Sequence, residues 1–349
     1  MNALCTIVTK SYLPFARALR ESLRRSDNHE KLFILLADSE LGEPAANSEE
    51  IQTIGLGNLS PTIPLLPRYY FSAFELCAVL KPYLITYLFQ QGAQKVVYLD
   101  SDIMVVGSLA RVWESISVKT LSLCPHHLTP PPMNLSYTSD LAVSDMGVFN
   151  AGFYGVRATR VADEMLTWMR ERLLVYGFSS RVNGMFTDQK MLPQLLQYYP
   201  EEVQILRDPG LNIAWWNAHE RKIETIGGRY TVQGTESVVF FHMSGYLASK
   251  PNLLCSYLPE ATTREILTSS PWFENVKREY YELLSRQSQD QQYSEYAFAI
   301  YNGMRLSPGL RALLLSKKTL SKSDPDVWKV CALDFLRSVK RKLFPYPER

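Results

Sequence analysis

The sequence predicts an α/β protein in which helices flank a mixed, mostly parallel sheet over residues 1–260, followed by a helical extension over residues 261–349. Strand-like apolar runs alternate with helical patterns along the first part, which is typical of a sheet with a parallel core. The run 96–99 has the β-branched and aromatic character of a strand that is buried on both faces. Beyond about residue 261 the patterns are helical, and we expect no strands there.

The first elements follow from the hydrophobic spacing. Up to about residue 68 we expect a looser region after the second strand, because Pro61, Pro64 and Pro67 interrupt regular structure. The pair Lys81-Pro82 lies inside the next helical pattern and implies a kink or a division into two helices. In chain order we expect a strand over 3–9, a helix over 13–26, a strand over 31–36 and a helix over 71–90.

The later elements contain more residues that interrupt, cap or turn the chain. Gly152 interrupts a strand, which suggests close approach of another backbone or a ligand. Thr187 or Asp188 is suited to cap a helix, and Gly227-Gly228 predicts a hairpin turn. The expected ranges are a strand over 121–124, a long loop over 126–140, a strand over 148–156, helices over 159–176 and from 187, a hairpin over 223–232, a strand over 237–241 and a helix over 272–285.

The composition excludes several classes of protein. The 349 residues carry a net charge of only +2, which argues against a nucleic-acid binder. No apolar stretch is long enough to span a bilayer, and residues 1–12 look like a first strand and not an export leader, so we expect a cytoplasmic protein. The five cysteines are odd in number and scattered, a pattern typical of buried thiols in a reducing compartment.

Two aspartates follow the central strand in the segment 95–109, which reads KVVYLDSDIMVVGSL. In extended chain, Asp100 and Asp102 would point to the same side, roughly 6.6 Å apart. Open α/β sheets bind ligands at this edge, and paired carboxylates suit a divalent cation that neutralises phosphate. The alternative is that both aspartates serve only a turn or a helix cap.

A histidine follows the last predicted strand in the segment 240–251, which reads FFHMSGYLASKP. His242 could complete an Asp, Asp, His metal set, while Gly245 and Lys250 would approach a diphosphate. A single histidine after an apolar strand is otherwise most often a structural residue.

With these segments, the chain resembles GT-A glycosyltransferases of family 8, such as glycogenin and bacterial lipopolysaccharide hexosyltransferases. The matching segments are TIVTKSYLPFARALRESL, YLDSDIMV, FNAGFYGVR, TDQKML and FHMSGYLASKP, between residues 3 and 255. The chain resembles still more a little-described bacterial group that shares CPHHLTPPP, ILRDPGLNIAWWNAHER and NGMRLSPGLR.

The family resemblance implies roles for individual residues. Asp188 and Gln189 would lie beside the donor sugar as catalytic residues, and Lys250 departs from the family pattern by two extra residues before it. The resemblance assigns Mn²⁺ or Mg²⁺ to Asp100, Asp102 and His242. It assigns the nucleotide-sugar donor, a UDP-hexose, to Thr6, Thr9, Tyr12, Lys81, Asp100, Ser101, Asn150, Gly152, Gly245 and Lys250.

The resulting expectation is a metal-dependent transfer of a hexose to a hydroxyl with retention, in the synthesis of a bacterial glycan or glycoconjugate. The acceptor would be a glycan, a lipid-linked sugar or a protein. One alternative is a catalytically silent carbohydrate-binding or effector-like protein. Another is a sugar nucleotidylyltransferase, although residues 8–20 lack the glycine-rich loop expected of that class.

Two further regions each allow two interpretations. The loop 126–140 with Trp215, Trp216 and Asn217 could form the acceptor pocket, or the tryptophans could belong to the core. From residue 310 onward, basic residues alternate with apolar ones. This tail could lie on the inner membrane face as a peripheral contact, or pack on the domain as a solvated helix.

Overall fold

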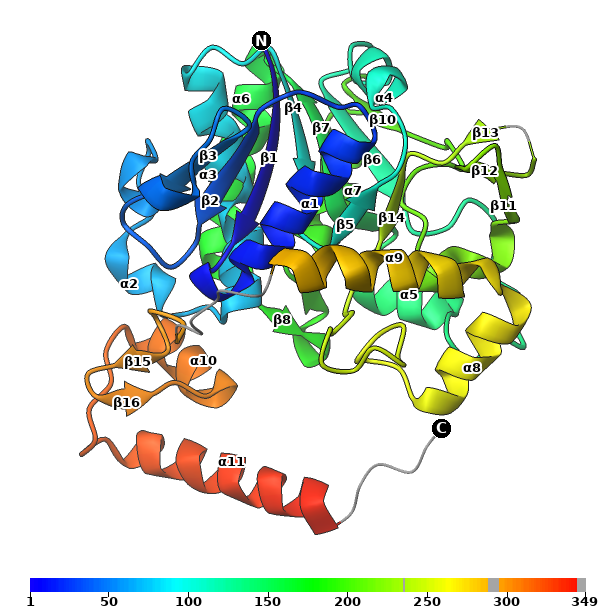
Figure 1. Ribbon diagram of the computed structural model, residues 1–349. Coiled ribbons are helices and arrows are strands. Elements are labelled where there is room, and N and C mark those ends of the chain that lie inside the picture. The colour runs from blue at the N-terminus through cyan, green and yellow to red at the C-terminus, as the bar shows by residue number, and fades with distance from the viewer. Residues whose placement is uncertain (235, 288–294, 344–349) are drawn as a thin grey trace.

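We analysed a computed structural model of the chain, which describes residues 1–234, 236–287 and 295–343 (Figure 1). Within this part of the chain, seven strands form one sheet in the order β10-β6-β7-β4-β1-β2-β3. Every neighbouring pair is parallel except for β7, which runs antiparallel to both β4 and β6. The prediction of a mixed, mostly parallel sheet flanked by helices is therefore confirmed. The strands of this sheet are β1 (Asn2–Val8), β2 (Leu32–Leu36), β3 (Ile51–Gly55), β4 (Lys95–Leu99), β6 (Leu121–Pro125), β7 (Phe149–Arg157) and β10 (Val203–Ile205).

Helices cover the two faces of this sheet and bury its apolar side chains (Figure 1). One face packs against α3 and α6, and the other packs against α1. The helices up to residue 200 are α1 (Leu13–Arg25), α2 (Leu65–Arg68), α3 (Ala73–Gln90), α4 (Ala110–Ser115), α5 (Asp140–Met146), α6 (Arg160–Tyr176) and α7 (Leu192–Tyr198).

Short strands outside the central sheet complete the first part of the chain. β5 (Ile103–Val105) pairs antiparallel with β14 (Phe240–His242), and Gly227 and Gly228 turn the chain between β11 and β12 as predicted. The remaining short strands are β8 (Ser179–Ser180), β9 (Met185–Phe186), β11 (Ile223–Ile226), β12 (Arg229–Val232) and β13 (Glu236–Ser237).

The prediction of a looser region up to residue 68 was wrong in two places. β3 extends the sheet beside β2, and the short helix α2 contains Pro67. Proline is tolerated in the first turn of a helix, where its missing N–H would have no helical partner anyway. α3 continues through Pro82 as one helix, so the division into two helices did not occur.

The C-terminal extension contains helices α8 (Glu260–Ser269), α9 (Trp272–Gln287), α10 (Pro308–Lys317) and α11 (Pro325–Leu343). It also contains a small hairpin of β15 (Ile300–Tyr301) and β16 (Met304–Arg305), so the expectation of no strands beyond residue 261 was wrong. Gly303 and Asn302 adopt positive φ in this hairpin, a turn that the helical pattern did not reveal. The Gln-rich link around 288–294 lies outside the described residues.

The extension is held to the body in two ways. α9 packs against α1, and its buried Phe273, Val276 and Tyr280 share a core cluster with Phe241 of β14 (Figure 1). The guanidinium of Arg311 on α10 is buried and donates to the backbone carbonyl oxygens of Tyr69, Phe71 and Phe298. Arg311 therefore contributes to the structure and not to a free basic surface. The domain boundary at residue 260 stays a prediction.

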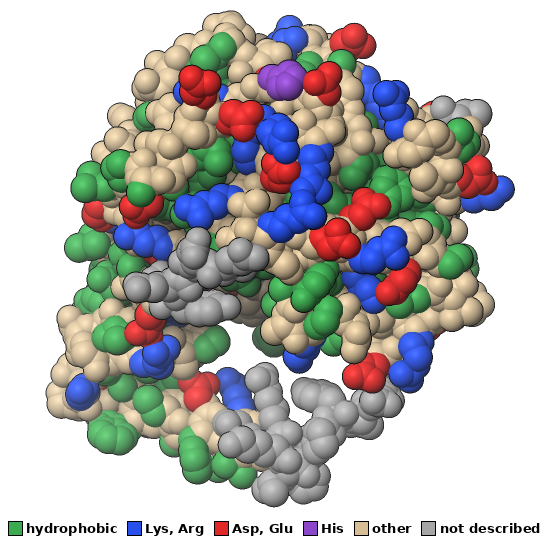
Figure 2. All heavy atoms as spheres, viewed as in Figure 1, with side chains coloured by type: hydrophobic (Ala, Val, Ile, Leu, Met, Phe, Trp, Pro, Cys, Tyr) green, Lys and Arg blue, Asp and Glu red, His purple; other side chains and the backbone are tan. Residues whose placement is uncertain are grey.

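α11 differs from the other helices because one of its faces is apolar and exposed. Trp328, Phe335 and Leu336 are 67%, 68% and 61% exposed. Figure 2 shows hydrophobic side chains along the lower edge of the molecule, where Figure 1 places α11. Val327 on the same helix is buried. In the described residues, no helix combines the length and apolar character needed to cross a membrane.

The cysteines are free thiols, as predicted. Burial raises the pKa of the Cys5 and Cys124 thiols. Cys331 on α11 is exposed, so the expectation of burial holds for the thiols in the core and not for this one.

Candidate functional site

The carboxyl edge of the sheet gathers the residues that the sequence singled out. β1 and β4 are parallel and in register at Cys5 and Tyr98, so Thr9 and Asp100 leave the sheet at the same edge. β7 is antiparallel to β4, with Phe153 opposite Leu99, so the start of β7 also lies there. This places Asn150 and Gly152 beside the aspartates.

A turn carries the two aspartates away from the sheet. The backbone N–H of Asp100 donates to Gly152 O at 2.8 Å, and the N–H of Ile103 donates to Asp100 O at 3.1 Å. The expectation of extended chain through Asp102 was therefore wrong, because β5 leaves the central sheet to pair with β14. That pairing sets His242 opposite Ile103, and the N–H of Met243 donates to Asp102 O at 2.9 Å.

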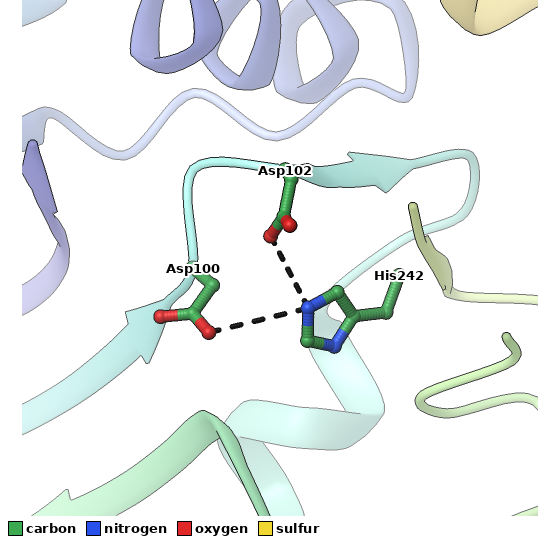
Figure 3. A group of neighbouring side chains, drawn as sticks. All are labelled: Asp100, Asp102 and His242. Carbon is green, nitrogen blue, oxygen red and sulfur yellow. Dashed lines mark ion pairs between the residues drawn. The ribbon is translucent and has the colours of Figure 1, made fainter. Parts of the chain in front are cut away.

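Asp100, Asp102 and His242 converge on one point (Figure 3). His242 Nε2 lies 3.1 Å from Asp102 Oδ1 and 4.0 Å from Asp100 Oδ2. One potential ligand atom from each residue lies within 4.8 Å of the others. The carboxylates are partly exposed while the imidazole is buried, so an ion could reach the group from solvent. Two carboxylate oxygens and an imidazole nitrogen fit a divalent cation such as Mn²⁺.

The charges of this group depend on one another. The pKa of Asp100 is raised, mainly because the carboxyl group is buried. The charge of Lys81 opposes this shift, and the charge of Asp102 adds to it. Burial acts in the same direction on Asp102, but His242 lowers the pKa of Asp102 on balance. Burial would lower the pKa of His242, yet Asp102 and Asp100 raise it overall. Two carboxylates compete for one imidazole, which is the electrostatic condition that a bound cation would relieve.

Lys81 joins the aspartates to Asp188. Its ammonium lies 3.7 Å from Asp100 Oδ1 and 3.1 Å from Asp188 Oδ2, and it donates to Ala151 O at 2.8 Å. Burial works to lower the pKa of Lys81, but Asp100 and Asp188 raise it overall, so the amine stays charged. The buried ammonium is thus surrounded by acceptors inside the protein.

Asp188 and Gln189 begin the 3₁₀ helix η5 (Asp188–Met191). Asp188 is buried and accepts from the hydroxyl groups of Tyr154 and, at 3.1 Å, Thr187. The Gln189 side chain accepts from Ala151 N at 2.9 Å and donates to Met146 O at 3.1 Å. Thr187 makes no capping hydrogen bond to a backbone N–H, so the expected cap at this helix did not form.

Other residues predicted to contact the nucleotide sugar lie in or just after β1 and in the turn after β4. Thr6 and Thr9 are buried at the end of β1, and Tyr12 is half exposed and stacks on Phe15 at 4.8 Å between ring centroids. Burial, and to a lesser extent Asp102, raises the pKa of Tyr12. Ser101 lies in the turn between them.

The segment after His242 is arranged differently for its two predicted residues. Gly245 has a φ of +76°, and a Cβ there would lie 2.6 Å from both Cys255 Sγ and the Tyr257 ring. Lys250 is exposed, and among the described residues it has no ion pair. The structure therefore brings Lys81, and not Lys250, into contact with the carboxylates.

Trp215, Trp216 and Asn217 of the predicted acceptor region lie in the core, whereas most residues of the loop 126–140 are exposed or half-buried. Trp215 and Trp216 are buried, and Asn217 donates to His126 O and Asn212 O while accepting from Ala214 N. The edge of the Trp216 ring contacts the imidazole of His242, with centroids 5.3 Å apart at 81°. The core interpretation of the tryptophans therefore describes these residues better.

Sequence reasoning missed two tyrosines of the site. Tyr98 donates to Asp100 Oδ1 at 2.6 Å, Tyr154 donates to Asp188, and the two residues lie opposite each other on β4 and β7. A signal was present for Tyr98, because residues i and i+2 of a strand share one face and Tyr98 precedes Asp100 by two.

Comparison with known proteins gives distant relatives. No protein-family profile matches the sequence. Two proteins of Bacillus subtilis strain 168, both described as uncharacterized, are similar. YfnF is 23% identical over 249 residues, which cover 70% of this chain and 82% of that protein. YfnD is 24% identical over 287 residues, which cover 78% of this chain and 88% of that protein.

Solved structures with some likeness include two sugar transferases. The glycosyltransferase GlyE of Streptococcus pneumoniae TIGR4 is 16% identical with a TM-score of 0.43, over 81% of this chain and 62% of that chain. This chain thus spans less than two thirds of GlyE. The galactosyltransferase LgtC, solved with donor and acceptor sugar analogues, is 15% identical with a TM-score of 0.43, over 77% of this chain and 96% of that chain.

Proposed function

We propose that this protein is a GT-A type glycosyltransferase that transfers a hexose from a nucleotide diphosphate sugar, with UDP as the nucleotide, to a hydroxyl group. The observation that carries the proposal is the convergence of Asp100, Asp102 and His242 at the carboxyl edge of the sheet, with Lys81 joining Asp100 to Asp188. Open α/β sheets bind nucleotides at this edge.

Asp100, Asp102 and His242 would hold Mn²⁺ or Mg²⁺. A cation bound there supplies positive charge that stabilises the departing diphosphate. Thr6 lies in β1, and Thr9 and Tyr12 follow that strand. These three residues would contact the nucleoside, and Asn150, Gly152 and Gly245 would border the diphosphate and sugar. Lys250 is exposed, and it would add a positive charge when the donor binds.

The proposed reaction proceeds with retention. The bond between the anomeric carbon and the leaving phosphate oxygen breaks, the acceptor oxygen bonds to the same carbon, and the acceptor proton passes to the leaving phosphate. Asp188 has its oxygens occupied by Tyr154, Thr187 and Lys81. This favours a positioning role over a covalent nucleophile, with Asp188 and Gln189 orienting the sugar and steadying positive charge at its anomeric carbon.

The test is release of nucleotide from a panel of UDP-, GDP- and dTDP-sugars, with Mn²⁺ or with EDTA. We expect slow, Mn²⁺-dependent release of UDP from one sugar, lost in Asp102→Ala and kept in Asp163→Asn, a control on the exposed side of α6. Metal-dependent nucleotide binding without turnover would instead support a catalytically silent protein. Absence of both would overturn the proposal.

A peripheral position at the inner membrane face in the cytoplasm is part of this proposal. α11 exposes the apolar side chains of Trp328, Phe335 and Leu336. Its basic residues Lys329 and Arg337 form ion pairs with Asp326 and Asp334 of the same helix. The predicted tail residues Lys340, Arg341 and Lys342 follow, with side chains outside the described set. An interfacial helix needs both an apolar face and basic charge. Replacing the three apolar residues by serine should abolish sedimentation with anionic liposomes, and sedimentation that persists would count against this position.

The acceptor is proposed only by class, as a glycan, a lipid-linked sugar or a protein with a free hydroxyl group. A lipid-linked acceptor would agree best with a protein positioned by α11. Incorporation of labelled sugar into a chloroform-extractable product would support it. Label confined to water-soluble glycan or to protein would point to the other classes.

A further inference from the structure

Asn212 has an unusual backbone conformation next to the candidate metal site. Its φ is +53°, which lies in the left-handed region. Residues other than glycine seldom adopt this conformation, although asparagine does so more often than most. The following residue, Ile213, forms a parallel bridge with Phe241, and the N–H of His242 donates to Ile213 O at 2.8 Å. The segment therefore runs beside β14 and turns the Asn212 side chain onto His242.

The two ring nitrogens of His242 face different partners. Nδ1 lies 3.3 Å from Asn212 Oδ1, while Nε2 faces Asp102 and Asp100. An amide oxygen can only accept, so this contact requires the proton on Nδ1. A neutral imidazole with its proton on Nδ1 presents a lone pair at Nε2, which is the form that binds a metal ion.

The surroundings of Asn212 leave it little freedom. Asn212 is only 1% exposed, and its backbone carbonyl oxygen accepts from Asn217 Nδ2 at 2.9 Å. The Asn217 side chain also accepts from Ala214 N at 2.9 Å, which closes the turn that contains Trp216. The Trp216 ring then packs edge-on against the imidazole. The oxygen of Asn212 and the ring of Trp216 thus fix the position of His242 from two sides.

We propose that Asn212 is a positioning residue, which holds the proton of His242 on Nδ1 and so directs the Nε2 lone pair to a cation shared with Asp100 and Asp102. The inference rests on the proposed metal site. It assigns a function to the positive φ of Asn212, because that conformation places the amide oxygen beside the ring.

The test compares Mn²⁺ affinity by calorimetry in the wild type and in Asn212 variants of the full chain. Asn212→Gly keeps the positive φ without strain but removes the acceptor, and we expect Mn²⁺ affinity to fall about 10- to 100-fold. Asn212→Asp keeps an acceptor and tolerates this φ, so its affinity should stay within about threefold of the wild type. Asn302→Gly, at a φ of +50° in the β15–β16 hairpin, is the matched control and should leave affinity unchanged.

A second readout does not depend on the metal. Nitrogen-15 NMR of the histidine rings should show a proton on Nδ1 of His242 in the wild type and in Asn212→Asp. The Nδ1 signal should change in Asn212→Gly. Wild-type Mn²⁺ affinity that persists in a folded Asn212→Gly protein would overturn the role of Asn212. A wild type that binds no Mn²⁺ would overturn the metal site itself, and an unchanged Nδ1 signal in Asn212→Gly would then overturn the contact as well.

Discussion

Gly152→Ala should damage the metal site through a single methyl group. Gly152 lies on β7 beneath the imidazole of His242, and a Cβ there would lie 2.4 Å from His242 Cε1 and 2.8 Å from Asn150 Oδ1. Ordinary contact between carbon atoms is about 3.5 Å, so the ring would have to move by about 1 Å. The sequence predicted close approach of another backbone or a ligand at this strand glycine, but the groups that approach it are side chains, and the nearest one belongs to the candidate metal ligand His242.

The size of the effect follows from that displacement. Overpacking in a buried site costs about 1–3 kcal/mol of folding free energy. Metal–ligand distances tolerate only about 0.2 Å, so a shift of about 1 Å removes His242 from the ligand set or distorts it. We expect Mn²⁺ affinity to fall at least about tenfold, which corresponds to about 1.4 kcal/mol of binding free energy.

The assay pairs Mn²⁺ calorimetry with urea unfolding, and Gly155→Ala is the matched control. Gly155 also lies on β7, and a Cβ there would lie 2.3 Å from Ile116 Cγ2. It is three residues from Gly152 and therefore points to the other face of the sheet. Both variants should lose stability, and only Gly152→Ala should lose Mn²⁺ affinity. Equal loss of affinity in both, or unchanged affinity in Gly152→Ala, would refute the reasoning.

Two further predictions concern buried titratable side chains. Burial lowers the pKa of His126 to about 3, below the value of about 6.5 in an unfolded chain, so the unfolded state takes up the proton first as the pH falls. The native state should lose stability between about pH 6.5 and 3, and this residue should contribute at most about 1.4 kcal/mol of unfolding free energy per pH unit. Urea unfolding at several pH values should show a weaker pH dependence of the unfolding free energy in His126→Gln, and an unchanged pH dependence would contradict this. Lys81→Met leaves Asp188 buried without its cation and should cost about 3–5 kcal/mol of unfolding free energy. Adding Asp188→Asn should recover part of that loss in a double-mutant cycle, and a double variant less stable than Lys81→Met would contradict the coupling.

Local patterns were sufficient to predict the central strand and the residues of the candidate metal group. Val96 to Leu99 form a buried strand because their side chains are apolar on both faces, and the parallel sheet then brings Asp100 to its carboxyl edge. His242 was also predictable, since it follows a short apolar strand. The sequence did not reveal that β5 pairs with β14, and this pairing is what brings His242 to Asp102.

Features that depend on tertiary contacts were beyond local patterns. β3 is an edge strand in a segment rich in polar residues, and its pairing with β2 fixes its conformation. Lys81 lies in the middle of an apolar helix, and only the fold shows that its ammonium meets Asp100 and Asp188. The positive φ of Asn212 likewise follows from the neighbouring strand, and no spacing rule indicates it.

A crystal structure of the protein grown with Mn²⁺ and UDP tests the central claim most directly. We expect an anomalous peak at the manganese absorption edge between Asp100, Asp102 and His242, with the diphosphate of UDP bound to the same ion. A peak elsewhere, or nucleotide bound away from the carboxyl edge of the sheet, would contradict the proposed site.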